Sequence, residues 1–375
     1  MKAVAILFAL VLAAPGWSQC HKLTDINATT PEGQLLQKAG LEEDPAKKLA
    51  LQEEFAAQFP QHEAAGWVYE QLLTAYLKAN DADKALGVAD KLAAMPPECV
   101  EDAQATLKAA ELKKDPDLVL KWSGKTSELA QKVVDSPKPT EADEVENWKA
   151  RVDYAKQVNT YTEYSLYAMA LATPDSKKQV ALIEALQQRN PKSEYLAKAQ
   201  DALFVAYQKS GATDKAVAFA QQVAATGTPS EDMLLVLTDD AAKKKDGEKV
   251  HTYSAKLVEL AGSKPKPEGV ADADWTKRKN TILGLAYYMN GKQYFNDGKL
   301  APADQELRKA LPLVEDSNAA LKPEVLFYLG LSNYKMEKIQ DAVNYFKACA
   351  ALKSPFQAQA TKNLTAMRTQ YHGIK

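Results

Sequence analysis

Residues 322–355 read KPEVLFYLGLSNYKMEKIQDAVNYFKACAALKSP, and this stretch decides the fold. Its first half carries Leu326, Leu329 and Gly330, and its second half carries Ala342 and Phe346, with Cys349 three residues later. Small residues at such positions let two antiparallel helices approach closely, and large ones fill the gap to the next pair. The stretch therefore predicts one helix-turn-helix unit.

The same alternation of large and small residues recurs along the chain. The separation from Ala85 to Val119 is 34 residues, that from Ala216 to Val250 is 34, and that from Ala303 to Ala342 is 39. A fixed period of this length is the signature of a repeat array. The matching positions are Tyr69, Leu72, Tyr76, Ala85, Ala89, Leu92 and Pro97; Leu203, Tyr207, Ala216, Ala220 and Val223; and Tyr287, Gly291, Tyr294, Ala303, Leu307 and Ala310.

These patterns resemble the tetratricopeptide repeat family, whose unit pairs helices A and B. The resemblance covers most of the chain, although Asn333 stands where the family has tyrosine in the last unit, with Tyr334 beside it. It implies an all-α fold, a right-handed α-solenoid of tetratricopeptide-like helix-turn-helix repeats with a C-terminal capping helix. The predicted segments are a signal peptide at 1–18, an irregular lead-in at 19–31, repeats at 32–135, a linker at 136–140, repeats at 141–262, a linker at 263–272, and repeats with the capping helix at 273–371.

Helix boundaries follow from capping residues and prolines. Asp44 before Pro45, Thr140 before Glu141, and Asp175 after Pro174 are typical of helix starts. The expected helices cover 32–39, 45–59, 62–79, 82–95, 98–113, 116–135, 141–172, 175–189, 193–209, 213–226, 230–245, 247–261, 273–297, 300–314, 322–336, 338–353 and 356–371.

Composition narrows the function. The chain has only 16 glycines in 375 residues, and its net charge is −2, with lysines and acidic residues interleaved. Interleaved charge without a basic patch argues against a nucleic-acid partner.

The N-terminus has the layout of a secretory signal peptide. Lys2 precedes an apolar run from Ala3 to Ala14, which is too short to span a bilayer, and small residues precede a cleavage point after Ser18. The chain is therefore expected to be exported, to the periplasm or outside the cell. Two alternatives stay open: an uncleaved anchor, and a lipoprotein anchored through Cys20, which is the one route that would give membrane association.

No residue pattern supports catalysis, a cofactor or a metal. His62 lacks a second histidine four residues on, Gly124 lacks the earlier glycine of a phosphate loop, and Asp81 and Asp272 begin no complete calcium loop. The three cysteines, Cys20, Cys99 and Cys349, form no evident disulfide framework; Cys349 is expected to be buried, and a Cys99–Cys349 bond to be absent. An enzyme with an unrecognised site remains an alternative.

The family resemblance implies that A helices line a concave groove for a protein or peptide partner. We therefore predict a non-catalytic scaffold without cofactors. The predicted partner-binding residues of the last two repeats are Tyr288, Lys292, Phe295, Phe327, Leu331 and Tyr334. In the repeat with Tyr69 the groove positions are Trp67, Glu70, Thr74 and Lys78.

Overall fold

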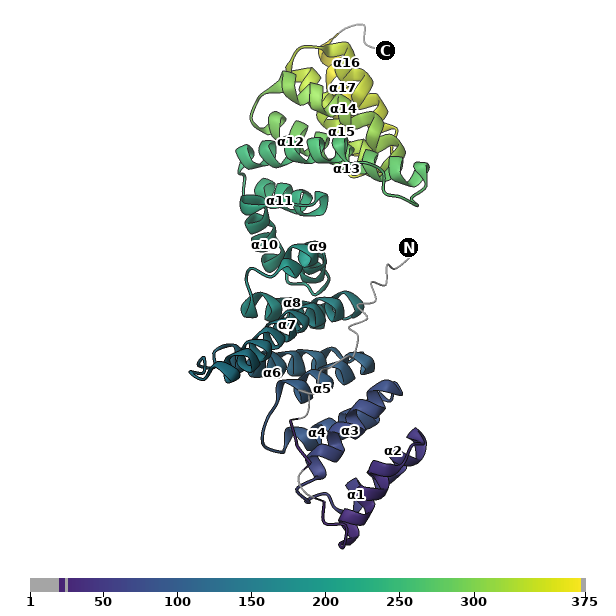
Figure 1. The fold of residues 1–375 in the computed structure, drawn as a ribbon. Coiled ribbons are helices and arrows are strands. Elements are labelled where there is room, and N and C mark those ends of the chain that lie inside the picture. The colour runs from purple at the N-terminus through teal and green to yellow at the C-terminus, as the bar shows by residue number, and fades with distance from the viewer. Residues whose placement is uncertain (1–19, 24–25, 372–375) are drawn as a thin grey trace. The chain divides into compact units, whose positions relative to one another are not determined.

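The computed structural model describes residues 20–23 and 26–371, and within these ranges the chain forms seventeen α-helices and no β-strand (Figure 1). The predicted signal peptide and cleavage point lie outside the described residues. The helices are α1 (Pro31–Leu41), α2 (Pro45–Gln58), α3 (Ala65–Lys78), α4 (Ala82–Ala93), α5 (Val100–Lys113), α6 (Pro116–Val134), α7 (Ala142–Ala172), α8 (Ser176–Arg189), α9 (Glu194–Lys209), α10 (Thr213–Thr226), α11 (Glu231–Lys243), α12 (Gly247–Ser263), α13 (Asp272–Asn296), α14 (Leu300–Ser317), α15 (Lys322–Lys335), α16 (Ile339–Ala350) and α17 (Gln357–Gln370).

The described helices fall into two compact units. The N-terminal unit runs to Gly211 and the C-terminal unit begins at Ala212. Within each unit a helix packs against its neighbour in sequence, and odd-numbered helices also contact one another: α3 with α5, α5 with α7, and α7 with α9 in the first unit, and α11 with α13 and α13 with α15 in the second. This arrangement of paired helices with one layer of A helices confirms the predicted all-α repeat fold.

Capping side chains begin several helices where the sequence indicates. The Asp44 carboxylate accepts hydrogen bonds from the backbone N–H groups of Ala46 and Lys47, and Asp175 does the same for Lys177 and Lys178. Such caps satisfy N–H groups that have no partner inside the helix. The starts predicted at Pro45 and near Asp175 are therefore confirmed.

Small residues sit where helices A and B approach most closely. Ala85, Ala216, Ala303 and Ala342 are all at most 1% exposed, as predicted. In the last repeat a Cβ atom added at Gly330 would lie 2.7 Å from the ring of Phe346, which comes from the opposite helix. Glycine at this position lets α15 and α16 touch, and their contact fixes the surface that α15 presents to its other neighbours.

Both Pro-rich segments expected as linkers lie inside a unit. The segment at 136–140 joins α6 to α7, and the segment at 263–272 joins α12 to α13; each of these helix pairs packs directly. The contact clustering instead divides the chain between α9 and α10. None of the described helices is long and apolar enough to cross a membrane.

Candidate functional site

The first three predicted partner-binding residues lie where α13 meets α15. The Lys292 ammonium donates to the Tyr288 hydroxyl at 3.0 Å and to the Glu324 carboxylate of α15 at 2.8 Å. It also lies 5.5 Å and 5.3 Å from the ring centres of Tyr288 and Tyr328. Phe295 meets Tyr328 edge to face, with ring centroids 5.3 Å apart. We call these five residues the α13–α15 seam.

The electrostatics of the seam follow from this geometry. Tyr288 is buried, and burial together with the nearby Glu324 carboxylate raises its pKa. Lys292 is partly buried, yet its hydrogen bond and charge pairing with Glu324 outweigh the desolvation and raise its pKa. The lysine therefore stays charged and its charge is already matched by Glu324. It does not stand unpaired at the rim to receive a carboxylate from a partner.

The other three predicted residues face the C-terminal end of the same unit. Phe327 packs against Phe346 and Phe356, with ring centroids 6.0 Å and 5.3 Å apart. The Tyr334 hydroxyl donates to Gln370 of α17 at 3.0 Å, and Leu331 packs on the same apolar cluster. These residues are partly buried beneath the last described helix.

The two groups occupy equivalent repeat positions. Phe327, Leu331 and Tyr334 lie 39 residues after Tyr288, Lys292 and Phe295. Each group faces the helix that follows in its layer: α15 for the first group and α17 for the second. The structure therefore brings the six residues together as two seams. Partner binding by either seam remains a prediction.

The cysteines pair in a way that the sequence analysis missed. Cys20 of the lead-in and Cys99, the residue before α5, form a disulfide with Cα atoms 6.1 Å apart, a normal span for such a bond. The expectation that the cysteines make no disulfide framework was therefore wrong. Cys349 is free and buried, and burial raises its pKa to about 11, so the predicted absence of a Cys99–Cys349 bond is confirmed.

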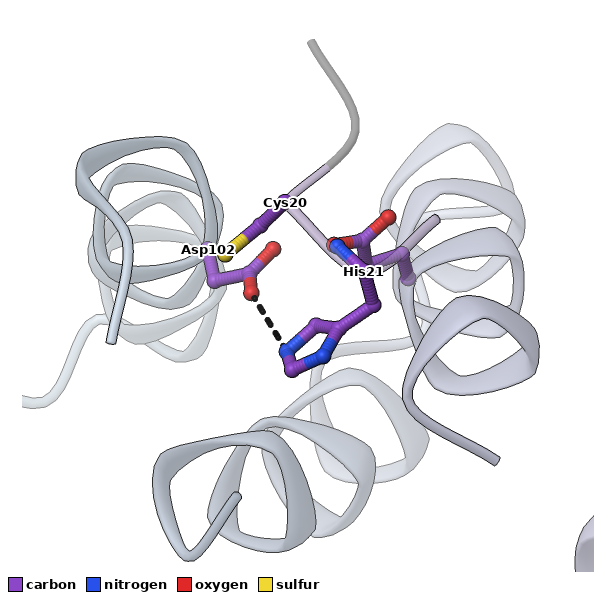
Figure 2. Close-up of side chains that lie close together, drawn as sticks. Cys20, His21 and Asp102 are labelled. Carbon is purple, nitrogen blue, oxygen red and sulfur yellow. Dashed lines mark hydrogen bonds and ion pairs between the residues drawn. The ribbon is translucent and has the colours of Figure 1, made fainter. Parts of the chain in front are cut away.

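The disulfide carries His21 into a cluster with Glu70 of α3 and Asp102 of α5 (Figure 2). Sequence reasoning placed Glu70 at the groove and the four histidines in unrelated stretches. Residues 20 and 21 join elements 49 to 81 positions further along, so no local spacing announces the cluster. The adjacent pair Cys20–His21, two metal-ligating residue types, was its one visible signal.

The motifs rejected on sequence have ordinary structural roles. His62 accepts a hydrogen bond from the Ala64 N–H at 3.1 Å, and Asp81 caps α4 through the Lys84 N–H at 3.0 Å. Gly124 lies inside α6. His251 sits between Asn290 and Asp297, at 2.6 Å and 2.9 Å from their side-chain oxygens, and stacks on Tyr294. His372 lies outside the described residues.

The paired helices, the layer of A helices and the small residues between them define an α-helical repeat protein of tetratricopeptide type. No protein-family model matches the sequence, and no curated protein does. Solved structures similar to this chain include one from the APC/C hetero-tetramer Cut9–Hcn1, at 13% identity over 91% of this chain and 56% of that one, with a TM-score of 0.35.

Two further structures are similar at the same low level. Yeast Tom70 is 13% identical over 94% of this chain and 68% of its own, with a TM-score of 0.28. The tetratricopeptide domain of P58(IPK) is 11% identical over 92% of this chain and 100% of its own, with a TM-score of 0.26. This chain spans little more than half of the Cut9–Hcn1 chain it matches, 56%. The fold assignment therefore rests on the chain's own helix pairs.

Proposed function

We propose that this protein is an exported, non-catalytic scaffold that binds a protein or peptide through the α13–α15 seam. The observation that carries the proposal is the pair Phe295 and Tyr328. Both rings are only partly buried, although they come from two different A helices and already touch each other. Aromatic side chains are favoured binding anchors because they bury a large area and lose little conformational freedom.

The charges around the seam indicate the chemistry of the partner. Lys335 is exposed, and its ammonium lies 5.0 Å from the ring centre of Phe295. Lys292 is neutralised by Glu324. A fitting ligand is thus a segment with an apolar or aromatic side chain that packs on Phe295 and Tyr328, and an acidic group that reaches Lys335.

The Cys20–Cys99 disulfide supports export. Disulfides persist in secreted and periplasmic proteins and are rare in the cytosol. The same bond weighs against the lipoprotein alternative, because a lipid thioether and a disulfide would both use the Cys20 sulfur. We therefore place the protein in the periplasm or outside the cell as a soluble chain, with the lipid-anchored form as the alternative.

The test is partner capture with matched variants. The mature chain, Phe295→Ala and Tyr164→Ala are each immobilised and exposed to extract from the native compartment, and bound proteins are quantified by mass spectrometry. Tyr164 is an aromatic residue of the other unit and is 43% exposed, so it serves as the control. We expect Phe295→Ala alone to deplete a specific partner, by about tenfold or more if the ring acts as an anchor. Equal capture by all three proteins would remove the seam from consideration.

A further inference from the structure

Four side chains of potential metal ligands converge where the lead-in segment meets α3 and α5. Their ligand atoms, from Cys20, His21, Glu70 and Asp102, all lie within 4.8 Å of one another. The His21 backbone N–H donates to Glu70 Oε1 at 2.8 Å, and His21 Nε2 lies 3.6 Å from Asp102 Oδ2. Figure 2 shows the imidazole and the Asp102 carboxylate turned toward one another between the helices.

The cluster is buried and its polar atoms are incompletely satisfied. The His21 and Asp102 side chains are only 10% and 17% exposed, and Glu70 is 7% exposed. His21 Nε2 and Glu70 Oε2 are fully buried, and neither has a hydrogen-bond partner among the described residues. Buried polar atoms without partners are costly, and two buried carboxyl groups beside one imidazole lack a matching positive charge. A divalent cation would satisfy all of these atoms together.

Gly66 is the residue that lets His21 into the cluster. A Cβ atom at position 66 would lie 2.6 Å from His21 Cγ and from Nδ1, and 3.1 Å from its Cβ. Gly66 is inside α3, where alanine would normally be the better helix former. The helix therefore carries a less favourable residue at the one position over which the imidazole lies, so the geometry of α3 is matched to the position of this ring.

We propose that Cys20, His21, Glu70 and Asp102 form a binding site for a divalent transition metal, zinc above all, when the Cys20–Cys99 disulfide is reduced. One sulfur, one imidazole nitrogen and two carboxylate oxygens form a closed four-ligand set of the kind that suits zinc. Tetrahedral zinc with bonds of about 2.0–2.3 Å separates its ligand atoms by about 3.3–3.8 Å. Small inward rotations from the present positions reach that geometry.

The chemistry of the two states balances. A phosphine reductant and one water convert the disulfide into the Cys20 and Cys99 thiols, and the phosphine becomes its oxide. Metal binding then displaces the proton of the Cys20 thiol to solvent, and the thiolate bonds to the metal. Because the same sulfur serves either bond, the disulfide and the metal are alternative ways of fastening the lead-in segment to α5. Neither depends on the partner proposed for the α13–α15 seam.

Cobalt(II) is the probe that distinguishes this site from surface binding, because a cobalt–thiolate bond gives a near-ultraviolet charge-transfer band. The phosphine-reduced mature chain should bind one cobalt ion with this band, and zinc should displace it. Cys99→Ala cannot form the disulfide and should bind cobalt without any reductant. Cys20→Ala should show no band, whereas Cys349→Ala, which alters the free cysteine in the other unit, should bind like the parent.

The remaining ligands have their own variants. His21→Ala and Asp102→Asn should each weaken cobalt binding by at least the 10–100-fold that loss of even an outer-shell partner costs. Gly66→Ala keeps every ligand but displaces the imidazole, so it should weaken binding while the helical content stays unchanged. The proposal is overturned if Cys20→Ala retains the band, if the oxidised chain binds cobalt as tightly as the reduced one, or if His21→Ala and Asp102→Asn bind like the parent.

Discussion

At the scale of single residues, the fold depends on close contacts between a glycine on one helix and a large side chain on the next. Gly291 lies against Leu307, and Gly330 lies against Phe346. The sequence indicated these positions because the repeat pattern places a small residue opposite a large one. Their contacts explain why the pattern survives even where Asn333 replaces the usual tyrosine: Asn333 is buried and donates to Asp304 at 2.6 Å.

Replacing Gly330 with alanine should destabilise the C-terminal unit. The new methyl group would overlap the Phe346 ring, and overpacking of this kind costs about 1–3 kcal/mol. Gly262→Ala is the matched control, since no atom lies within 4 Å of its added Cβ in the same unit. There alanine should give no loss, and a gain of up to about 0.5–1 kcal/mol. Thermal unfolding followed by circular dichroism compares the two, and equal melting temperatures would contradict the contact.

Glu111 offers a test by pH. It is a partly buried residue of α5 that accepts hydrogen bonds from the hydroxyls of Tyr161, at 2.5 Å, and of Ser165. Burial raises its pKa above the ordinary glutamate value in spite of these bonds. The folded state therefore holds this proton at pH values where the unfolded chain has lost it, and the contribution to stability falls as pH rises through that window.

Glu111→Gln cannot titrate, so it lacks this loss. Urea unfolding of variant and parent across the window from the ordinary glutamate pKa upward should show the free-energy difference moving in favour of the variant as pH rises. Below the window the difference should be constant. A difference that moves toward the parent with rising pH would mean that the hydrogen bonds from α7 outweigh the burial.

The cysteine and histidine residues show where residue-level reasoning fails. Cys349 was predicted to be buried because it occupies a repeat position with known packing. Cys20 and His21 belong to no repeat, so periodicity says nothing of what they touch. Their contacts with Glu70, Cys99 and Asp102 depend on where a non-helical segment returns to the repeats, and only the three-dimensional structure contains that information.

At the scale of elements, helix positions follow closely from the sequence because local signals set them. The expected helix at 213–226 is the observed α10, and the long expected helix at 141–172 is α7, which begins at Ala142. Prolines, capping aspartates and repeat spacing all act within a few residues. The direction that an A-helix position faces is different, because the next helix decides it. The six predicted partner-binding residues therefore divide between two seams.

The last helix should stabilise the C-terminal unit through one apolar stripe. Ala360, Leu364 and Met367 of α17 pack against the cluster that contains Phe346 and Cys349. Leu364→Ala should cost about 2–3 kcal/mol, within the range for truncating a buried leucine. Thr365→Ala alters the exposed neighbour on the same helix and should change little. Unfolding curves that coincide for the two variants would mean that α17 does not cover the repeat beneath it.

At the scale of the whole molecule, the thiol chemistry connects the structure with the compartment. Protein isolated from its native source without reductant should contain a Cys20–Cys99 cross-link and a free Cys349 thiol. The mature chain is expected to begin at Gln19. Peptide mapping under non-reducing conditions measures all three. A diacylglyceryl adduct on Cys20 would replace the soluble form by the lipoprotein alternative, and both cysteines reduced in the native protein would contradict export.

The central claim is that a partner docks on the α13–α15 seam, and site-specific photo-crosslinking tests it most directly. Benzoylphenylalanine is placed at Phe295, and in a parallel chain at the exposed Tyr164 of the other unit. Irradiation in the native compartment should cross-link one discrete partner at position 295, and competition with excess unlabelled mature chain should remove it. The account is contradicted if position 295 yields no adduct, or only the adducts seen at position 164, while both proteins remain folded.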